Sequence, residues 1–110
     1  MSYQHKELAA GKWAGLSFVE QMANIGSEVE RALSWQKKNN AEYAQKAFER
    51  SLELIDLTLD SNTIDSHFKE IARLRETIVD YFFGNNEFKS TEALWQNYFS
   101  HFTYAARRGH

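Results

Sequence analysis

Arg75 is the residue whose position most needs a chemical explanation. At about 100° per residue it falls in the middle of a helical face that is otherwise apolar. Burying an unpaired guanidinium there would cost several kcal/mol, so we expect a counterion, and Glu28, at the edge of an earlier apolar face, is the first candidate. Three roles stay open, with the first favoured: a structural ion pair, an ion pair across an oligomer interface, and an anchor for a ligand anion. The apolar residues around Arg75 are Ile64, Phe68, Ile71, Ile78, Val79 and Phe82.

Two histidines, His67 and His101, lie near the edges of apolar helical faces. A single histidine in such a place is more often structural than a metal ligand or a base. Metal sites of the ferritin kind use Glu-x-x-His pairs, and Ile64 and Tyr98 occupy the glutamate positions here. The sequence therefore predicts no metal site and leaves His67 as a candidate neighbour of Arg75 in a small-ligand site.

Four acidic residues follow one line of a helix and form a narrow stripe. Such a stripe is usually a solvated face, and this is the prediction we make. The alternative is attraction of a divalent ion or a basic partner. The four residues are Glu49, Glu53, Asp56 and Asp60.

Motifs that indicate catalysis are missing from the sequence. There is no Gly-x-Ser-x-Gly, no P-loop and no dinucleotide-binding glycine pattern. HEPN-domain ribonucleases are small helical bundles with an arginine followed by a histidine four to six residues later, but after Arg75 those positions hold Val79, Asp80 and Tyr81. We therefore predict no catalytic residues, no cofactor and a protein that is not an enzyme.

The composition describes an ordinary globular chain with helix as its main structure. The 110 residues include no cysteine and no proline, and the net charge of −2 is spread evenly. Without cysteine there are no disulfides and no thiolate metal sites, which fits a cytoplasmic location. No apolar run is long enough for a membrane span, and the first residues lack the apolar region of a signal peptide.

Helical periodicity and capping signals predict an all-α, antiparallel up-down-up-down four-helix bundle. Ser17 and Glu20 form a capping box, Asn40 lies in a turn, Gly84 is expected to supply a left-handed C-terminal cap, and Ser90 or Thr91 begins the last helix. The predicted helices are 17–38, 41–59, 64–83 and 91–106. Residues 1–16 are expected to be a partly ordered lead-in, held by Trp13 and Leu16, to a single domain of residues 17–110.

The second and fourth helices have apolar faces wider than a monomeric bundle of this size should bury. We therefore predict self-association through one or both, with a dimer as the commonest assembly. The candidate interface residues are Phe48, Leu52, Leu59, Trp95, Phe99 and Phe102.

Residues 24–28 and Arg31-Ala32 of the first helix resemble the Asn-Ile-Ala-Glu-Gly segment of the 23S rRNA intervening-sequence (S23) four-helix proteins. Later segments are similar to small uncharacterised prokaryotic proteins known as predicted helical domains. The resemblance implies a prokaryotic origin, a four-helix fold and ring or dimer assembly, and it implies no activity. The later segments are residues 73–76, 80–84, 90–91 and 98–99.

Three functions follow from these observations. The leading prediction is a non-enzymatic oligomeric bundle that acts as a protein-interaction or accessory module. The second is a nucleic-acid accessory like the S23 proteins, which the net charge of −2 disfavours unless oligomerisation gathers the basic residues Lys37, Lys38, Arg107 and Arg108. The third is a small-ligand site built from Arg75, Glu28 and His67.

Overall fold

The protein is an all-α four-helix bundle, as its sequence predicts. The structure, a computed structural model, describes residues 11–62 and 64–108, and within these ranges there is no strand. A short 3-10 helix, η2 (Trp13–Gly15), precedes the four α-helices. These are α1 (Phe18–Lys37), α2 (Ala41–Ser61), α3 (Asp65–Phe82) and α4 (Glu92–Arg108), so each predicted boundary is within two residues of the observed one.

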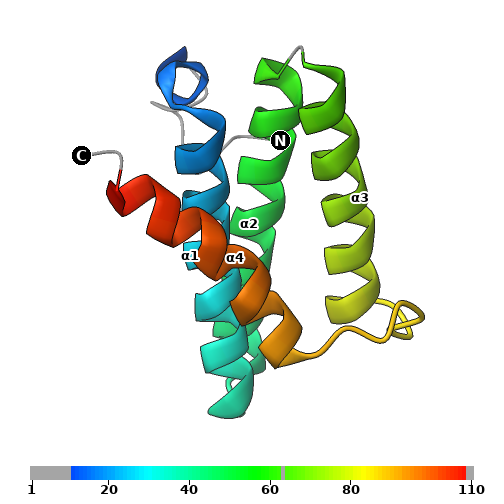
Figure 1. Cartoon of the computed structure of the whole chain (residues 1–110). Coiled ribbons are helices and arrows are strands. Elements are labelled where there is room, and N and C mark those ends of the chain that lie inside the picture. Colours follow the sequence, from blue (N-terminus) through cyan, green and yellow to red (C-terminus); the bar gives the residue numbers. More distant parts are fainter. Residues whose placement is uncertain (1–10, 63, 109–110) are drawn as a thin grey trace.

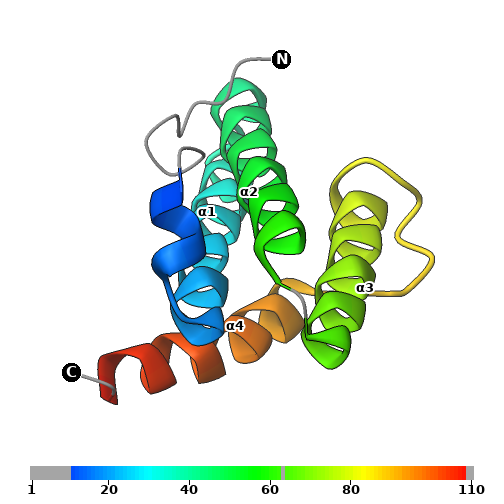
Figure 2. The ribbon, with the colours of Figure 1, turned by 90° about the horizontal axis from the view of Figure 1, so that it is seen from above.

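The four helices pack unequally. Helices α1, α2 and α3 stand in that order and run in alternating directions, while α4 crosses α1 obliquely (Figure 1). The most extensive contacts join α1 to α2 and α1 to α4, whereas α3 packs mainly on α2. Figure 2 shows α4 extending from beside α3 past α1. Helix α3 is therefore the least covered of the four.

The predicted N-terminal caps are present. The Ser17 hydroxyl accepts from the Glu20 backbone N–H, and the Glu20 carboxylate accepts from the Ser17 N–H, which completes the capping box. The Asn40 side chain caps α2, and the Thr91 hydroxyl accepts from the Leu94 N–H at the start of α4. Each of these caps involves residues within one turn, so the helix starts are specified by local sequence.

The predicted left-handed cap at Gly84 is wrong. After α3 the left-handed conformation is instead adopted by Asn86 (φ 53°) and Lys89 (φ 54°). The turn is organised by Asp80, whose carboxylate accepts hydrogen bonds from the backbone N–H groups of residues 87 and 88. A Cβ on Gly84 would lie 3.0 Å from the Asp80 carbonyl oxygen, a tight contact, so the glycine lets the chain pass close to the end of α3 without displacing it.

Trp13 belongs to the hydrophobic core although it precedes α1. Its side chain is 2% exposed, and its indole N–H donates a 2.9 Å hydrogen bond to the Thr58 hydroxyl on α2. The Gln21 side chain donates to the Trp13 carbonyl and to the Ser61 hydroxyl. The prediction that Trp13 attaches the lead-in to the bundle is confirmed, whereas residues 1–10 of that segment lie outside the described residues.

The apolar face predicted on α3 is covered only in part. Ile71 and Ile78 are fully buried, and Val79 and Phe82 pack against the edge of the core. Ile64 and Phe68, in contrast, are 55% and 46% exposed. Ile64, immediately before α3, and Phe68, in its first turn, therefore present apolar surface that the described part of the chain leaves about half uncovered.

None of the helices in the described ranges combines the length and the apolar character needed to cross a membrane.

Candidate functional site

Arg75 pairs with Asp56, and the predicted pairing with Glu28 is wrong. The Arg75 Nε lies 2.8 Å from Asp56 Oδ1 on α2, and the two side chains are 41% and 44% exposed. Helix α2 stands between α1 and α3, so α3 meets α2 rather than the helix that carries Glu28 (Figure 1). An ion pair this exposed contributes at most about 1 kcal/mol to the stability of the fold. Arg75 is therefore not the buried charge that its place on the apolar face suggested.

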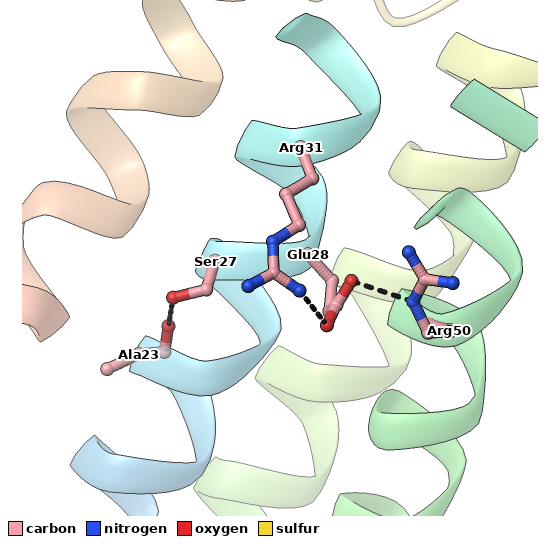
Figure 3. Close-up of polar contacts among 5 residues, drawn as sticks. All are labelled: Ala23, Ser27, Glu28, Arg31 and Arg50. Carbon is pink, nitrogen blue, oxygen red and sulfur yellow. Dashed lines mark hydrogen bonds and ion pairs between the residues drawn. The ribbon is translucent and has the colours of Figure 1, made fainter. Parts of the chain in front are cut away.

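Glu28 is the buried member of a different ion-pair cluster. Its carboxylate is 9% exposed and lies between two guanidinium groups, Arg31 Nη1 at 3.2 Å and Arg50 Nε at 3.1 Å. Figure 3 shows Arg31 approaching from the next turn of α1 and Arg50 from α2. Each carboxylate oxygen has a charged donor, so the cluster joins α1 to α2 and leaves Glu28 no free role in ligand binding.

We expect Glu28→Gln to lower the free energy of unfolding by about 1–2 kcal/mol, because a buried amide cannot neutralise two guanidinium groups. Chemical denaturation measures the change. The matched control is Glu42→Gln, which removes an exposed pair with Lys46 and should cost about 0.5 kcal/mol or less. Equal effects of the two variants would contradict the assignment of Glu28 as a buried interhelical pair.

His67 packs as a structural residue. Its ring stacks on Phe18 at a centroid distance of 3.9 Å and an interplanar angle of 5°. Its Nδ1 is buried without a hydrogen-bond partner in the described protein. Among the described residues no three His, Asp or Glu side chains are grouped as metal ligands. The structure therefore does not bring Arg75, Glu28 and His67 together.

The acidic stripe of α2 is not a uniform solvated face. Glu53 is buried, and Asp56 forms an ion pair with Arg75. Glu49 and Asp60 are exposed. The prediction of a solvated stripe is therefore wrong for Glu53. The reason is that α2 has neighbours on both sides, so its exposed surface is narrower than helical spacing suggested.

Three of the candidate interface residues are core residues of a single chain. Phe48, Trp95 and Phe99 are at most 5% exposed, so their assignment to a contact surface is wrong. They are covered because α4 crosses α1 closely and because Phe48 packs against Phe82 and Phe83. Three others are partly buried at the edge of the core: Leu52, Leu59 and Phe102.

The basic residues are not gathered on one surface of the chain. Lys37 and Lys38 end α1, where Lys37 pairs with Glu92 and Lys38 lies over the Trp35 ring. Arg107 and Arg108 end α4 at the other end of α1, where Arg107 lies beside residues 23 and 24. These four residues therefore do not form one basic patch within a single chain.

An apolar hollow lies between α3 and α4. We call it the α3–α4 groove, and its volume is about 440 Å³. On one side the Tyr98 hydroxyl donates a 2.7 Å hydrogen bond to the Glu70 carboxylate, and burial and this bond raise the pKa of Tyr98 well above its usual value. The groove is lined by Glu70, Arg73, Leu74, Thr77, Ser90, Leu94, Trp95 and Tyr98.

Sequence reasoning missed this groove. Residues 70, 73, 74 and 77 share one face of α3 by helical spacing, and Leu94 and Tyr98 share a face of α4. This spacing can be read from the sequence. A single sequence does not indicate, however, that these two helical faces lie close together and leave a groove between them. The structure thus offers two candidate functional surfaces, the α3–α4 groove and the exposed apolar residues Ile64 and Phe68.

The chain was compared with protein-family models, with curated proteins and with solved structures, and no match was found in any of the three.

Proposed function

We propose that the protein is a non-enzymatic interaction module that forms a homodimer through the N-terminal half of α3. The observation that carries this proposal is the uncovered apolar face of that helix. Ile64 and Phe68 lie one helical turn apart, and both are about half exposed. The exposed residue Ala72 continues the same line toward Arg75.

The hydrophobic effect favours covering this surface. Full burial of an isoleucine or phenylalanine side chain stabilises by about 1.5–3 kcal/mol relative to full exposure. Covering the exposed halves of two such side chains on each copy therefore contributes favourable free energy to dimer formation. Part of this gain offsets the loss of translational and rotational freedom on association. The expected result is a dimer of moderate affinity.

A second copy of the chain is a suitable partner because the surface is self-complementary. In an antiparallel pairing of two α3 helices, Phe68 of each copy lies over Ala72 of the other, and the small side chain makes room for the ring. The same register brings Asp65 level with Arg75 of the partner subunit. Both groups already have partners within the chain, Lys69 for Asp65 and Asp56 for Arg75, and ion pairs as exposed as these exchange at little cost. Charge complementarity thus supports the apolar contact.

Phe68→Glu tests the proposal because it introduces a repulsive charge into both halves of a symmetric contact. Sedimentation velocity at chain concentrations from about 1 to 100 µM should find a dimer for the wild type and a monomer for Phe68→Glu. The matched control is Leu94→Glu on α4, which replaces a residue that is also 55% exposed and should leave the dimer unchanged. A wild type that stays monomeric, or a dimer lost only with Leu94→Glu, would refute the proposed interface.

A further inference from the structure

We propose that the α3–α4 groove binds a small organic anion with a flat apolar body. Its volume of about 440 Å³ is within the range of ligand pockets, about 300–1,000 Å³. Leu74, Leu94 and Trp95 supply apolar walls from two helices. Leu94 is 55% exposed, so the groove opens to solvent and a ligand can enter without displacing a helix.

The Trp95 indole supplies an aromatic wall of the groove, and its own N–H is buried behind that wall. Trp95 is 5% exposed, and its Nε1 is buried without a hydrogen-bond partner in the described protein. Leaving a buried N–H unpaired costs free energy, and most native indole groups find an acceptor. Trp95 lines the groove, but its Nε1 has almost no accessible surface, so a bound molecule meets the indole as an apolar wall and not as a hydrogen-bond donor.

Arg73 supplies the charge recognition. Among the groove residues, Arg73 is the cation and Glu70 is the anion. The Glu70 carboxylate already accepts from the Tyr98 hydroxyl, whereas the Arg73 guanidinium has no ion pair or hydrogen bond in residues 11–62 and 64–108. A planar guanidinium binds carboxylate and sulfonate groups through two parallel hydrogen bonds, so an anionic head group fits this end of the groove.

The groove and the proposed dimer contact are different surfaces of α3. Arg73 is five residues after Phe68, which is about 140° around the helix axis. A second copy that covers Phe68 therefore leaves the groove open. Each proposal can fail without the other, and ligand binding here does not depend on the dimer.

The probe is anilinonaphthalene sulfonate, a flat aromatic anion whose fluorescence rises in apolar surroundings. Phenylnaphthylamine has the same aromatic body without the sulfonate, so the pair separates apolar contact from anion recognition. Binding to the full chain is titrated by probe fluorescence and by quenching of tryptophan emission. The variants are Arg73→Gln, Trp95→Phe and the control Lys69→Gln, which removes an exposed cation one turn earlier on α3. Circular dichroism checks that each variant is folded.

We expect one anion bound per chain, weakened about three- to ten-fold by Arg73→Gln and unchanged by Lys69→Gln, whereas Trp95→Phe keeps an aromatic wall and should weaken binding less than Arg73→Gln. The uncharged probe should bind with an affinity that Arg73→Gln leaves unaltered. Equal weakening by Arg73→Gln and Lys69→Gln, or no binding to the wild type, would overturn the proposal. One probe per two chains, with affinity that changes with protein concentration, would identify the groove as an interface between copies and would overturn it as well.

Discussion

Trp13→Ala is expected to lower the free energy of unfolding by about 3–5 kcal/mol, the largest effect of any single substitution considered. The indole is 2% exposed, and its N–H donates to the Thr58 hydroxyl on α2. Alanine would leave a large cavity and remove that hydrogen bond. The result can be measured by urea denaturation followed by far-ultraviolet circular dichroism.

Trp35→Ala is the matched control, since it removes the same side chain from a less buried position. Trp35 is partly exposed and its ring contacts Tyr43 edge-on at a centroid distance of 4.8 Å. We expect a loss of about 1–2 kcal/mol for this control. If Trp13→Ala cost no more than Trp35→Ala, Trp13 would not be part of the core.

Gly26→Leu is expected to lower the free energy of unfolding by about 3 kcal/mol, at the upper end of the range for overpacked cores. Gly26 is buried in α1 where α4 crosses it, and a Cβ there would lie 2.8 Å from the Cβ and the Cγ of Phe99. These atoms are near the α4 backbone and cannot move aside without moving the helix. Replacing a glycine inside a helix normally stabilises the helix by about 0.5–1 kcal/mol. A destabilising effect of Gly26→Leu would therefore indicate a steric clash with Phe99.

Ser34→Leu is the control for this substitution because Ser34 is exposed on the same helix. It should change stability by about 0.5 kcal/mol or less. The double variant Gly26→Leu with Phe99→Ala should be more stable than the sum of the single losses, by about 1–3 kcal/mol, because the leucine fills the space left by the ring. Additive losses would contradict a direct contact between the two positions.

The helices could be predicted from the sequence because their signals are local. The Ser17–Glu20 capping box and the Asn40 and Thr91 caps act within one turn, and the apolar spacing extends over each helix. Trp13 could be predicted to hold the lead-in on the bundle because a tryptophan side chain buries a large apolar area when it packs. The Gly84 prediction failed because the Asp80 carboxylate, rather than a left-handed glycine, arranges the chain after α3.

The partners of the charged residues could not be predicted, because they depend on which helices are neighbours. Arg75 appeared central to an apolar face, yet that face is open at one side and Asp56 is within reach. Glu28 was expected near Arg75 and instead joins α1 to α2 through Arg50. The oblique crossing of α4 likewise decides that Trp95 and Phe99 are core residues, and nothing in the apolar spacing specifies a crossing angle.

The resemblance to the S23 proteins stays a prediction, and so does the absence of enzymatic activity. The segment that carries the resemblance includes Gly26 and Glu28, which have architectural roles here. Gly26 permits the crossing of α1 and α4, and Glu28 binds two arginines. These roles explain the residues without any reference to nucleic acid.

The central claim, that the N-terminal half of α3 pairs with the same surface of a second copy, is tested most directly by cross-linking single-cysteine variants with a short bis-maleimide. The chain has no cysteine, so Ala72→Cys provides one thiol on the proposed contact, and Ala105→Cys provides one on an exposed position of α4. In the proposed register the two thiols of Ala72→Cys are offset by four residues, about 6 Å along the helix axis, which a bis-maleimide spans and a disulfide does not. The proposal predicts rapid cross-linking of Ala72→Cys, slowed when Phe68→Glu is added, and little for Ala105→Cys. Cross-linking at equal rates, or faster through Ala105→Cys, would contradict it.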